Sequence, residues 1–327
     1  MIHLFFIKLL IEVVMYLVAP RTIFPESCST LLYSSEGQLL GARIAPDGQW
    51  RFPPADTIPD KFVTCLLTYE DKRFYRHPGI DPIAIARAAR LNLTARRVVS
   101  GGSTITMQLA RIARGNRNRT LYEKAVETAW ALLLETAYSK DKILNLYASH
   151  APFGGNVVGI EAAAWRYFGR NAAELSWAES ATLAVLPNSP ALIHPGRNRE
   201  KLKAKRDKLL ASLKKSGVLD ETTYELACME PLPEAPVPLP DEAPHLLERL
   251  AADAPGTRIT TSVRQMLQRQ AQAIVNRYAR DYSSNYIHNL AALVTDTETG
   301  EVLAYAGNVT FRADARKGNQ EVGGPKR

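Results

Sequence analysis

Residues 70–79 read Glu70-Asp71-Lys72-Arg73-Phe74-Tyr75-Arg76-His77-Pro78-Gly79, which places a carboxylate just after the apolar segment Phe62–Leu67. A second candidate carboxylate, Glu127, lies further along the chain, and a Gly-Gly-Ser turn, a glutamine and several cations stand between the two. Two carboxylates that frame a cationic pocket suit the transfer of a sugar from a phosphate carrier. One can act as a base towards a hydroxyl group while the cations hold a departing phosphate, so Glu70 and Glu127 are the candidate catalytic residues.

The composition is that of a folded protein with a basic balance. Of the 327 residues, 46% are hydrophobic and 23% are charged, and the formal net charge is +8. A chain of this length can hold one large core or two domains. The positive balance favours nucleic acid, anionic lipid or a phosphorylated substrate as a partner. The spacing of the charges in Lys201–Lys215 predicts that most of this segment is a solvated helix surface.

Several metal-binding and catalytic classes have no support in the sequence. The cysteines Cys28, Cys65 and Cys228 are far apart and form no CxxC pair, so neither a zinc site nor a disulfide framework is indicated. The chain contains no HExxH, GxGxxG or Walker sequence. A literal Ser-x-x-Lys occurs at 212–215 but overlaps the Lys-Ser-Gly at 215–217, whereas a serine acyl-enzyme needs these elements on separate parts of its fold.

Hydrophobic periodicity predicts that most of the chain is helical. Strand and turn signals occupy 31–52, and apolar residues then recur at intervals of three and four from about 59 to 213. The clearest predicted helix is Leu121–Tyr138, which begins with a capping box of Thr120 and Glu123. The other predicted elements are a helix after Gly159, helices over 177–186 and 263–282, and a hairpin within 290–305.

The segment Gly101–Arg111 is predicted to be a loop that leads into a helix. Ser103 can cap this helix, and the free N–H groups at a helix start attract anions, so a phosphate could bind there. Gln108 and Arg111 lie about one turn apart and can add donors. The alternative is a plain capped helix without a ligand.

Arg119, Lys124 and Glu127 form a second candidate cluster. Two cations with one carboxylate could clamp a diphosphate, directly or through a divalent cation such as Mg²⁺ or Mn²⁺. Lys124 and Glu127 lie about one turn apart on the same side of the predicted helix. The alternative is an ion pair on a helix surface, which contributes little to stability.

The N-terminal segment 1–18 is mostly apolar but contains Lys8 and Glu12. It is slightly shorter than the about 20 residues that span a bilayer. We expect a retained, single-pass membrane anchor; a cleaved signal peptide and an amphipathic interfacial helix are the alternatives. Further along, the prolines of Glu230–Pro244 predict an extended, semi-rigid linker.

Three motifs resemble the peptidoglycan glycosyltransferase domain, family 51. They are Glu-Asp-x-x-Phe-x-x-His-x-Gly at 70–79, Gly-Gly-Ser-Thr-Ile-Thr-x-Gln at 101–108 and Arg-Thr-Leu-x-x-Lys-x-x-Glu at 119–127. The same family is indicated by the segments at 142–147, 153–154, 159–169 and 179–184. Order and spacing agree from about Gln49 to Gly217, and shorter segments at 106–108, 151–155 and 184–187 resemble class A penicillin-binding proteins of the 1C type.

The resemblance implies a mainly α-helical, lysozyme-like domain that polymerises lipid II into β-1,4-linked glycan strands and releases undecaprenyl diphosphate. Glu70 matches the base that removes the proton of the acceptor 4-hydroxyl. Glu127 matches the carboxylate that assists the leaving diphosphate, alone or with a divalent cation. Residues that match substrate-binding positions near the diphosphate are Ser103, Gln108, Arg111, Arg119 and Lys124.

The resemblance also implies a location and partners. The location is the cytoplasmic membrane, with one N-terminal span and the catalytic domain on the periplasmic side. The partners are lipid II, the growing glycan strand, membrane lipid and other cell-wall synthesis proteins, and not nucleic acid.

The chain departs from the family at two kinds of position. Met107 and Arg111 stand where Gln and Lys are common, although the 1C type shares the methionine. Leu290–Asn308 resembles the first strands of a transpeptidase domain, but Arg327 comes before any catalytic Ser-x-x-Lys, so peptide acyl transfer is not expected.

The expected division is an anchor (1–18), a short β-rich connector (19–48), a glycosyltransferase domain (49–217), a helix end with a Pro-rich linker (218–244) and a small α/β segment that is the incomplete start of a transpeptidase domain (245–327). The alternatives to a transferase are a lysozyme-like lytic glycosidase and an inactive, truncated remnant.

Overall fold

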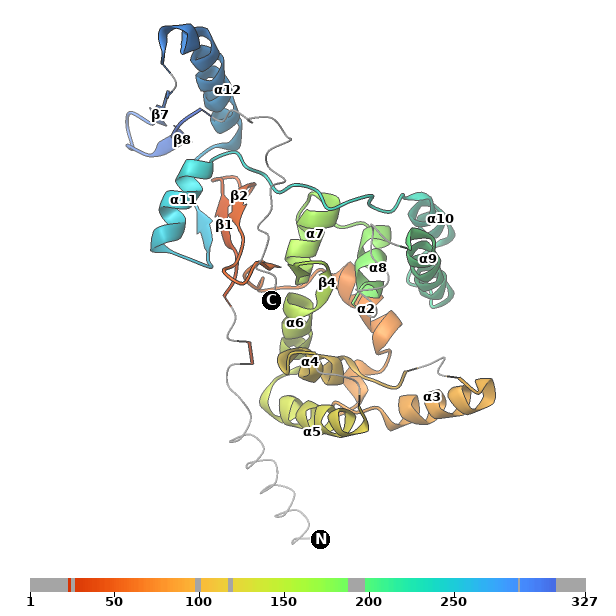
Figure 1. Ribbon diagram of the computed structural model, residues 1–327. Coiled ribbons are helices and arrows are strands. Elements are labelled where there is room, and N and C mark those ends of the chain that lie inside the picture. The colour runs from red at the N-terminus through yellow and green to blue at the C-terminus, as the bar shows by residue number, and fades with distance from the viewer. Residues whose placement is uncertain are drawn as a thin grey trace, which may run out of the picture. The chain divides into compact units, whose positions relative to one another are not determined.

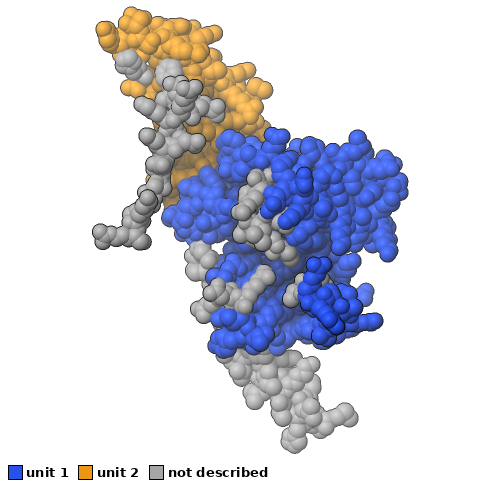
Figure 2. Space-filling model, turned by 45° about the vertical axis from the view of Figure 1, so that its right-hand side comes forward, with its two compact units in different colours: residues 1–29, 44–239 blue, residues 30–43, 240–327 orange. Residues whose placement is uncertain are grey.

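The computed structural model describes residues 23–24, 27–97, 101–116, 120–187, 198–287 and 289–309. The chain forms two compact units, shown in Figure 2: unit 1 comprises residues 1–29 and 44–239, and unit 2 comprises 30–43 and 240–327. The predicted anchor (1–18) and Arg119 lie outside the described residues. Within the described ranges, no helix has both the length and the apolar character needed to cross a membrane.

Unit 1 is mainly helical, as predicted (Figure 1). Its α-helices are α2 (Asp60–Glu70), α3 (Pro82–Ala95), α4 (Ile105–Ala113), α5 (Leu121–Ala137), α6 (Lys140–His150), α7 (Ile160–Phe168), α8 (Trp177–Val185), α9 (Arg199–Lys215) and α10 (Glu221–Met229). Short 3₁₀ turns lie at Phe74–Arg76 and Ala172–Glu174. A small sheet has the strand order β3 (Trp50–Arg51), β5 (Val157–Val158), β4 (Pro152–Gly154).

Side-chain caps begin most of these helices where polar residues precede apolar runs. The Thr120 side chain accepts from Glu123 N at the start of α5, and Ser176 forms a full capping box with Glu179 at the start of α8. The predicted cap of α4 was wrong. Thr104 Oγ1, and not Ser103, accepts from Met107 N, which leaves the Ser103 hydroxyl available for another role.

The buried helix α4 organises the centre of unit 1. Its residues 105–110 are all buried, and it packs against α5 and α6. The segment after α2 is tied to the start of α4 because Asp71 Oδ2 accepts from Ile105 N at 3.1 Å and His77 Nε2 lies 3.0 Å from the same carboxylate. Thr104 Oγ1 also donates to the Gly79 carbonyl at 2.6 Å. These bonds hold the C-terminal end of α2, and therefore Glu70, against α4.

Gly79 occupies a position that no other residue fits. Its φ is +85°, in the left-handed region, and a Cβ there would lie 2.9 Å from the Ala131 carbonyl oxygen and 2.9 Å from Glu135 Cγ. We expect Gly79→Ala to lower the free energy of unfolding of unit 1 by about 3 kcal/mol, from backbone strain together with overpacking. The four tryptophans of the chain, at 50, 130, 165 and 177, all lie in unit 1, so tryptophan fluorescence in a denaturant titration reports this unit.

Gly48 provides the matched control. Its φ is +74°, but a Cβ there would meet nothing within 4 Å. Gly48→Ala therefore carries only the backbone cost, about 1 kcal/mol. Equal losses in the two variants would contradict the steric argument for Gly79.

Unit 2 is a smaller α/β unit. Its first sheet has the order β2 (Leu39–Arg43), β1 (Thr30–Tyr33), β6 (Arg258–Thr260), in which β1 and β6 are parallel and Leu32 pairs with Ile259. Helix α11 (Pro244–Asp253) covers a core that includes Leu32, Leu40, Leu247 and Val263. Helix α12 (Gln265–Tyr282), a 3₁₀ turn (Ser283–Asn285) and the antiparallel hairpin β7 (Ala292–Thr295) and β8 (Val302–Ala306) complete it.

The observed units differ from the predicted boundaries at two places. The expected connector 19–48 is divided, because residues 30–43 pair with β6 and belong to unit 2. The expected linker 218–244 is also divided. Helix α10 and the prolines up to Leu239 belong to unit 1, where Val237 N donates to the Arg166 carbonyl and Arg166 Nη1 donates to the Val237 carbonyl. The proline-rich stretch contains no helix or strand over 231–240 and is bonded to unit 1 along part of its length.

Candidate active site

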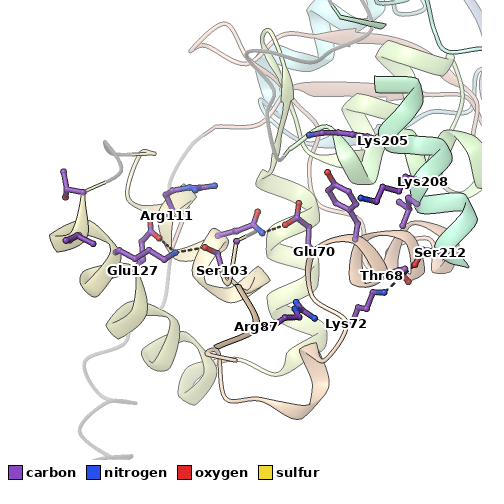
Figure 3. Close-up of a pocket in the computed structure, with 17 residues that line it drawn as sticks. Thr68, Glu70, Lys72, Arg87, Ser103, Arg111, Glu127, Lys205, Lys208 and Ser212 are labelled. Atoms are coloured by element: carbon purple, nitrogen blue, oxygen red, sulfur yellow. Dashed lines mark hydrogen bonds and ion pairs between the residues drawn. The ribbon is translucent and has the colours of Figure 1, made fainter. Parts of the chain in front are cut away.

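A cleft of about 960 Å³ opens on unit 1 between the end of α2, the segment before α4, the start of α5, and α9 (Figure 3). Glu70 and Glu127 both line it, and so do four of the five predicted substrate-binding residues: Ser103, Gln108, Arg111 and Lys124. The fifth, Arg119, lies outside the described residues. The segments that the sequence singled out separately therefore meet in one cavity.

Glu70 is the last residue of α2 and is held by a hydrogen bond from α4. Gln108 Nε2 donates to Glu70 Oε2 at 2.7 Å, and Gln108 is only 7% exposed. The Tyr147 hydroxyl of α6 donates to Gln108 Oε1 at 3.2 Å on the far side of the amide. Burial, with a smaller contribution from the charge of Glu70, raises the pKa of the neighbouring Tyr69 to about 12. The carboxylate is thus oriented, and it still faces the cleft.

Glu127 lies on the first half of α5 and is paired with a lysine one turn earlier. Lys124 Nζ lies 2.9 Å from Glu127 Oε2 and donates to Ser103 Oγ at 2.8 Å. The Glu127 side chain is 8% exposed, whereas that of Lys124 is 42% exposed. The ammonium group therefore reaches open space in the cleft, with a hydroxyl on one side and a carboxylate on the other. This arrangement suits an incoming anion better than a surface ion pair would.

Helix α9 contributes a group of cations that the sequence did not identify. Lys205 and Lys208 line the cleft, together with Ser212, whose hydroxyl lies 3.5 Å from Lys72 Nζ. In the view of Figure 3, Glu70 lies between these α9 side chains and the Ser103–Glu127 side of the cleft. Arg87 of α3 also lines the cleft. Burial lowers the pKa of Lys205, and the negative charge of Glu70 opposes this shift.

The prediction of a mostly solvated surface over 201–215 was therefore incomplete. Leu202, Leu209 and Leu213 form a buried stripe on α9, and Arg206 on the same helix is only 1% exposed. Lys205 and Lys208 lie beside that stripe. The apolar spacing of the leucines was a usable signal for a buried face, but it could not show that the neighbouring lysines face a cleft.

Glu127 is the candidate ligand for a divalent cation. In the ranges described, no group of three or more His, Cys, Asp or Glu side chains lies close enough to hold a metal ion. Glu127 offers one carboxylate, and Mg²⁺ sites that act on phosphates commonly use one or two carboxylates with the phosphate oxygens of the substrate.

Comparison with known proteins decides the family. A sequence model of the family described as "Transglycosylase" matches residues 37–214, more than half of the chain. The chain belongs to the transglycosylase family. It is 35% identical over 305 residues to penicillin-binding protein 1C of Escherichia coli. The alignment covers 93% of this chain and 39% of that protein. The similarity to penicillin-binding protein 1C supports the same family assignment.

Two other relatives extend the comparison. Penicillin-binding protein 1A of Aquifex aeolicus is 38% identical to this chain over 201 residues. That alignment covers 62% of this chain and 27% of the relative. A crystal structure of penicillin-binding protein 1A from Haemophilus influenzae aligns with 84% of this chain and 32% of that chain, at 17% identity and a TM-score of 0.35, too low to transfer structural detail. The chain thus spans less than half the length of the relatives that it matches.

Proposed function

We propose that this transglycosylase-family chain polymerises lipid II into β-1,4-linked glycan strands and releases undecaprenyl diphosphate, and that unit 1 is a lysozyme-like catalytic domain. The observation that carries the proposal is the position of Glu70 and of the Lys124–Glu127 pair in a single cleft with several cations. A general base and a group of cations in one cavity match the two demands of the reaction, proton removal from an acceptor and neutralisation of a departing diphosphate.

Glu70 is the proposed base. Its carboxylate takes the proton of the acceptor 4-hydroxyl as that oxygen forms a bond to the anomeric carbon of the donor. The bond from this carbon to the diphosphate oxygen breaks, and the configuration at the anomeric centre inverts. Gln108 donates to Glu70 Oε2, which stabilises the ionised form that accepts the proton.

The diphosphate is proposed to bind at the Ser103–Lys124 side of the cleft. Lys124 and Arg111 supply positive charge there, and Ser103 supplies a hydroxyl 2.8 Å from Lys124 Nζ. Arg119 is proposed as a further contact, by its match to the family motif. Glu127 orients the lysine, and with the phosphate oxygens of the substrate it would hold Mg²⁺ or Mn²⁺. Such an ion would neutralise charge on the leaving group.

The location and the partners follow from the same proposal. A lipid-linked substrate requires that the cleft open towards a bilayer, so we propose attachment to the cytoplasmic membrane through 1–18, with the catalytic unit on the periplasmic side. The proposed partners are lipid II, the growing glycan strand, membrane lipid and other cell-wall synthesis proteins. Nucleic acid is not a proposed partner.

The direct test is incubation of the full chain with labelled lipid II in detergent or vesicles. The expected product is a glycan polymer, with release of undecaprenyl diphosphate. Cleavage of preformed glycan without polymerisation of lipid II would instead identify a lytic glycosidase. If the folded chain carried out neither polymerisation nor cleavage, the proposal would be overturned.

The lysines of α9 make a separate prediction. Lys205→Met removes a cation that lines the cleft near Glu70 but keeps most of the side-chain volume. We expect kcat/KM for lipid II to fall about tenfold, the usual effect of one hydrogen bond to a charged group. Lys201→Met changes an exposed lysine of the same helix that does not line the cleft, and it should leave kcat/KM unchanged. If both variants and the unaltered chain had equal kcat/KM values, Lys205 would not contribute to the site.

A further inference from the structure

A hydrogen-bond relay runs from the core of unit 1 to the proposed base. The Tyr147 hydroxyl donates to Gln108 Oε1 at 3.2 Å, and Gln108 Nε2 donates to Glu70 Oε2 at 2.7 Å. Tyr147 lies on α6 and has no exposed surface, whereas Glu70 lines the cleft. The relay therefore joins a residue that no substrate can touch to the carboxylate that is proposed to take the proton.

The directions of both hydrogen bonds are determined by chemistry. An ionised carboxylate can only accept, so the NH₂ group of Gln108 has to face Glu70. Its carbonyl oxygen then faces Tyr147, and only a protonated hydroxyl can satisfy it. Burial raises the pKa of Tyr147 well above its ordinary value, and the charge of Glu70 raises it further, so the hydroxyl stays protonated as a donor.

The contact with Glu70 prevents Gln108 from turning over. A half-turn of the amide would place its carbonyl oxygen against Glu70 and its NH₂ group against Tyr147. The first contact joins two acceptors in a region of low exposure, where an unmatched polar pair costs the most. Without the hydroxyl of Tyr147, the amide in its observed orientation loses the donor to its carbonyl oxygen, and it is held less firmly against Glu70.

We propose that Tyr147 is a positioning residue for the transferase reaction, acting through Gln108 to keep a hydrogen-bond donor on Glu70. This inference rests on the proposed role of Glu70 as the base. Tyr147 does not touch the substrate; it holds in place an amide that in turn orients the reacting carboxylate.

The test is Tyr147→Phe in the full chain, which removes one oxygen and keeps the ring. We expect kcat with lipid II to fall about fivefold, with a smaller change in KM, because a weaker hydrogen bond to the base leaves the substrate contacts in place. The acid limb of the pH–rate profile should also move to higher pH by roughly half a unit. The ionised form of Glu70 is the active one, and a weaker hydrogen bond to that form raises its pKa.

Other groups in the cleft stay unchanged in this variant, so a shift of the acid limb of the pH–rate profile can be assigned to the relay. Besides the Lys124–Glu127 pair, the charged and titratable groups among the described residues that line the cleft with Glu70 are Tyr69, Lys72, Arg87, Arg111, Lys205 and Lys208.

Tyr167→Phe is the matched control. Tyr167 is a buried tyrosine of the same unit, and its hydroxyl donates to the Phe153 carbonyl at 2.9 Å, outside the relay. It should cost stability without moving the acid limb. An acid limb that moves equally in both variants, or in neither, would overturn the proposal. An unaltered chain without polymerising activity would instead contradict the proposed function.

A second variant keeps the inference testable if Tyr147→Phe folds poorly. Gln108→Met with Tyr147→Phe replaces both buried polar partners by apolar groups, which is commonly tolerated. If Tyr147 acts only through Gln108, this double variant and Gln108→Met alone should have the same rate and the same acid limb. A further loss in the double variant would show that Tyr147 acts by another route and would overturn the proposal.

Discussion

Glu70→Gln should abolish polymerisation of lipid II, with a loss of about 10³-fold or more in kcat. The amide keeps the shape of the side chain and can still accept from Gln108 Nε2, but it cannot take a proton from the acceptor hydroxyl. The measurement is the rate of glycan formation from labelled lipid II. Tryptophan fluorescence and thermal unfolding should show an intact unit 1, because the substitution removes no packing.

The control for this prediction is Glu221→Gln. Glu221 begins α10 and pairs with Lys214, and it lies outside the cleft, so its loss should leave the rate within about twofold. Substantial polymerisation by Glu70→Gln, from a preparation free of unaltered protein, would overturn the assignment of Glu70 as the base. An equal loss in Glu221→Gln would point to a general effect on the fold.

Lys124→Met is expected to lower kcat/KM for lipid II about 10²-fold. The substitution removes the ammonium group that bridges Ser103 and Glu127, and it leaves the Glu127 carboxylate unpaired at the place proposed for the diphosphate. The charge of the Lys124–Glu127 pair changes from neutral to negative when the lysine is lost, and this opposes both binding of the donor and departure of the diphosphate. The rate with lipid II and the binding of undecaprenyl diphosphate both measure the effect.

Lys203→Met provides the comparison for Lys124. Lys203 also pairs with an acidic residue about one turn away, since its Nζ lies 2.6 Å from Asp207 Oδ2, but it is exposed and does not line the cleft. It should change neither the rate nor the binding. If Lys124→Met bound undecaprenyl diphosphate as tightly as the unaltered chain, the proposed place of the diphosphate would be wrong.

The predicted helices around the site were largely confirmed because their signals are local. The capped segment predicted at 121–138 is the helix Leu121–Ala137, and the helix predicted after Gly159 is Ile160–Phe168. The spacing of three between Lys124 and Glu127 was enough to place both on one side of a helix, and they are hydrogen-bonded. The cap of α4 was harder to predict from the sequence. Ser103 and Thr104 are adjacent residues of similar chemistry, and the exact residue at which the helix begins decides between them.

Features that join distant segments could not be derived in this way. The pairing of β1 with β6 places 30–43 in unit 2, although these residues precede the whole catalytic region in the chain. The lysines of α9 and the relay through Tyr147 likewise depend on which helix packs against which. Hydrogen-bonding chemistry limits the partners of a buried tyrosine, but it does not select one among the many carbonyl groups of a core.

From the sequence alone came the identity of the chemical groups and the helices that carry them, because helix period and capping act over a few residues. Only the tertiary structure placed Glu70, Gln108 and the α9 lysines around one cavity. That placement depends on burial of apolar faces from segments far apart in the chain. The pattern of apolar residues along one segment does not show which other segment packs against it.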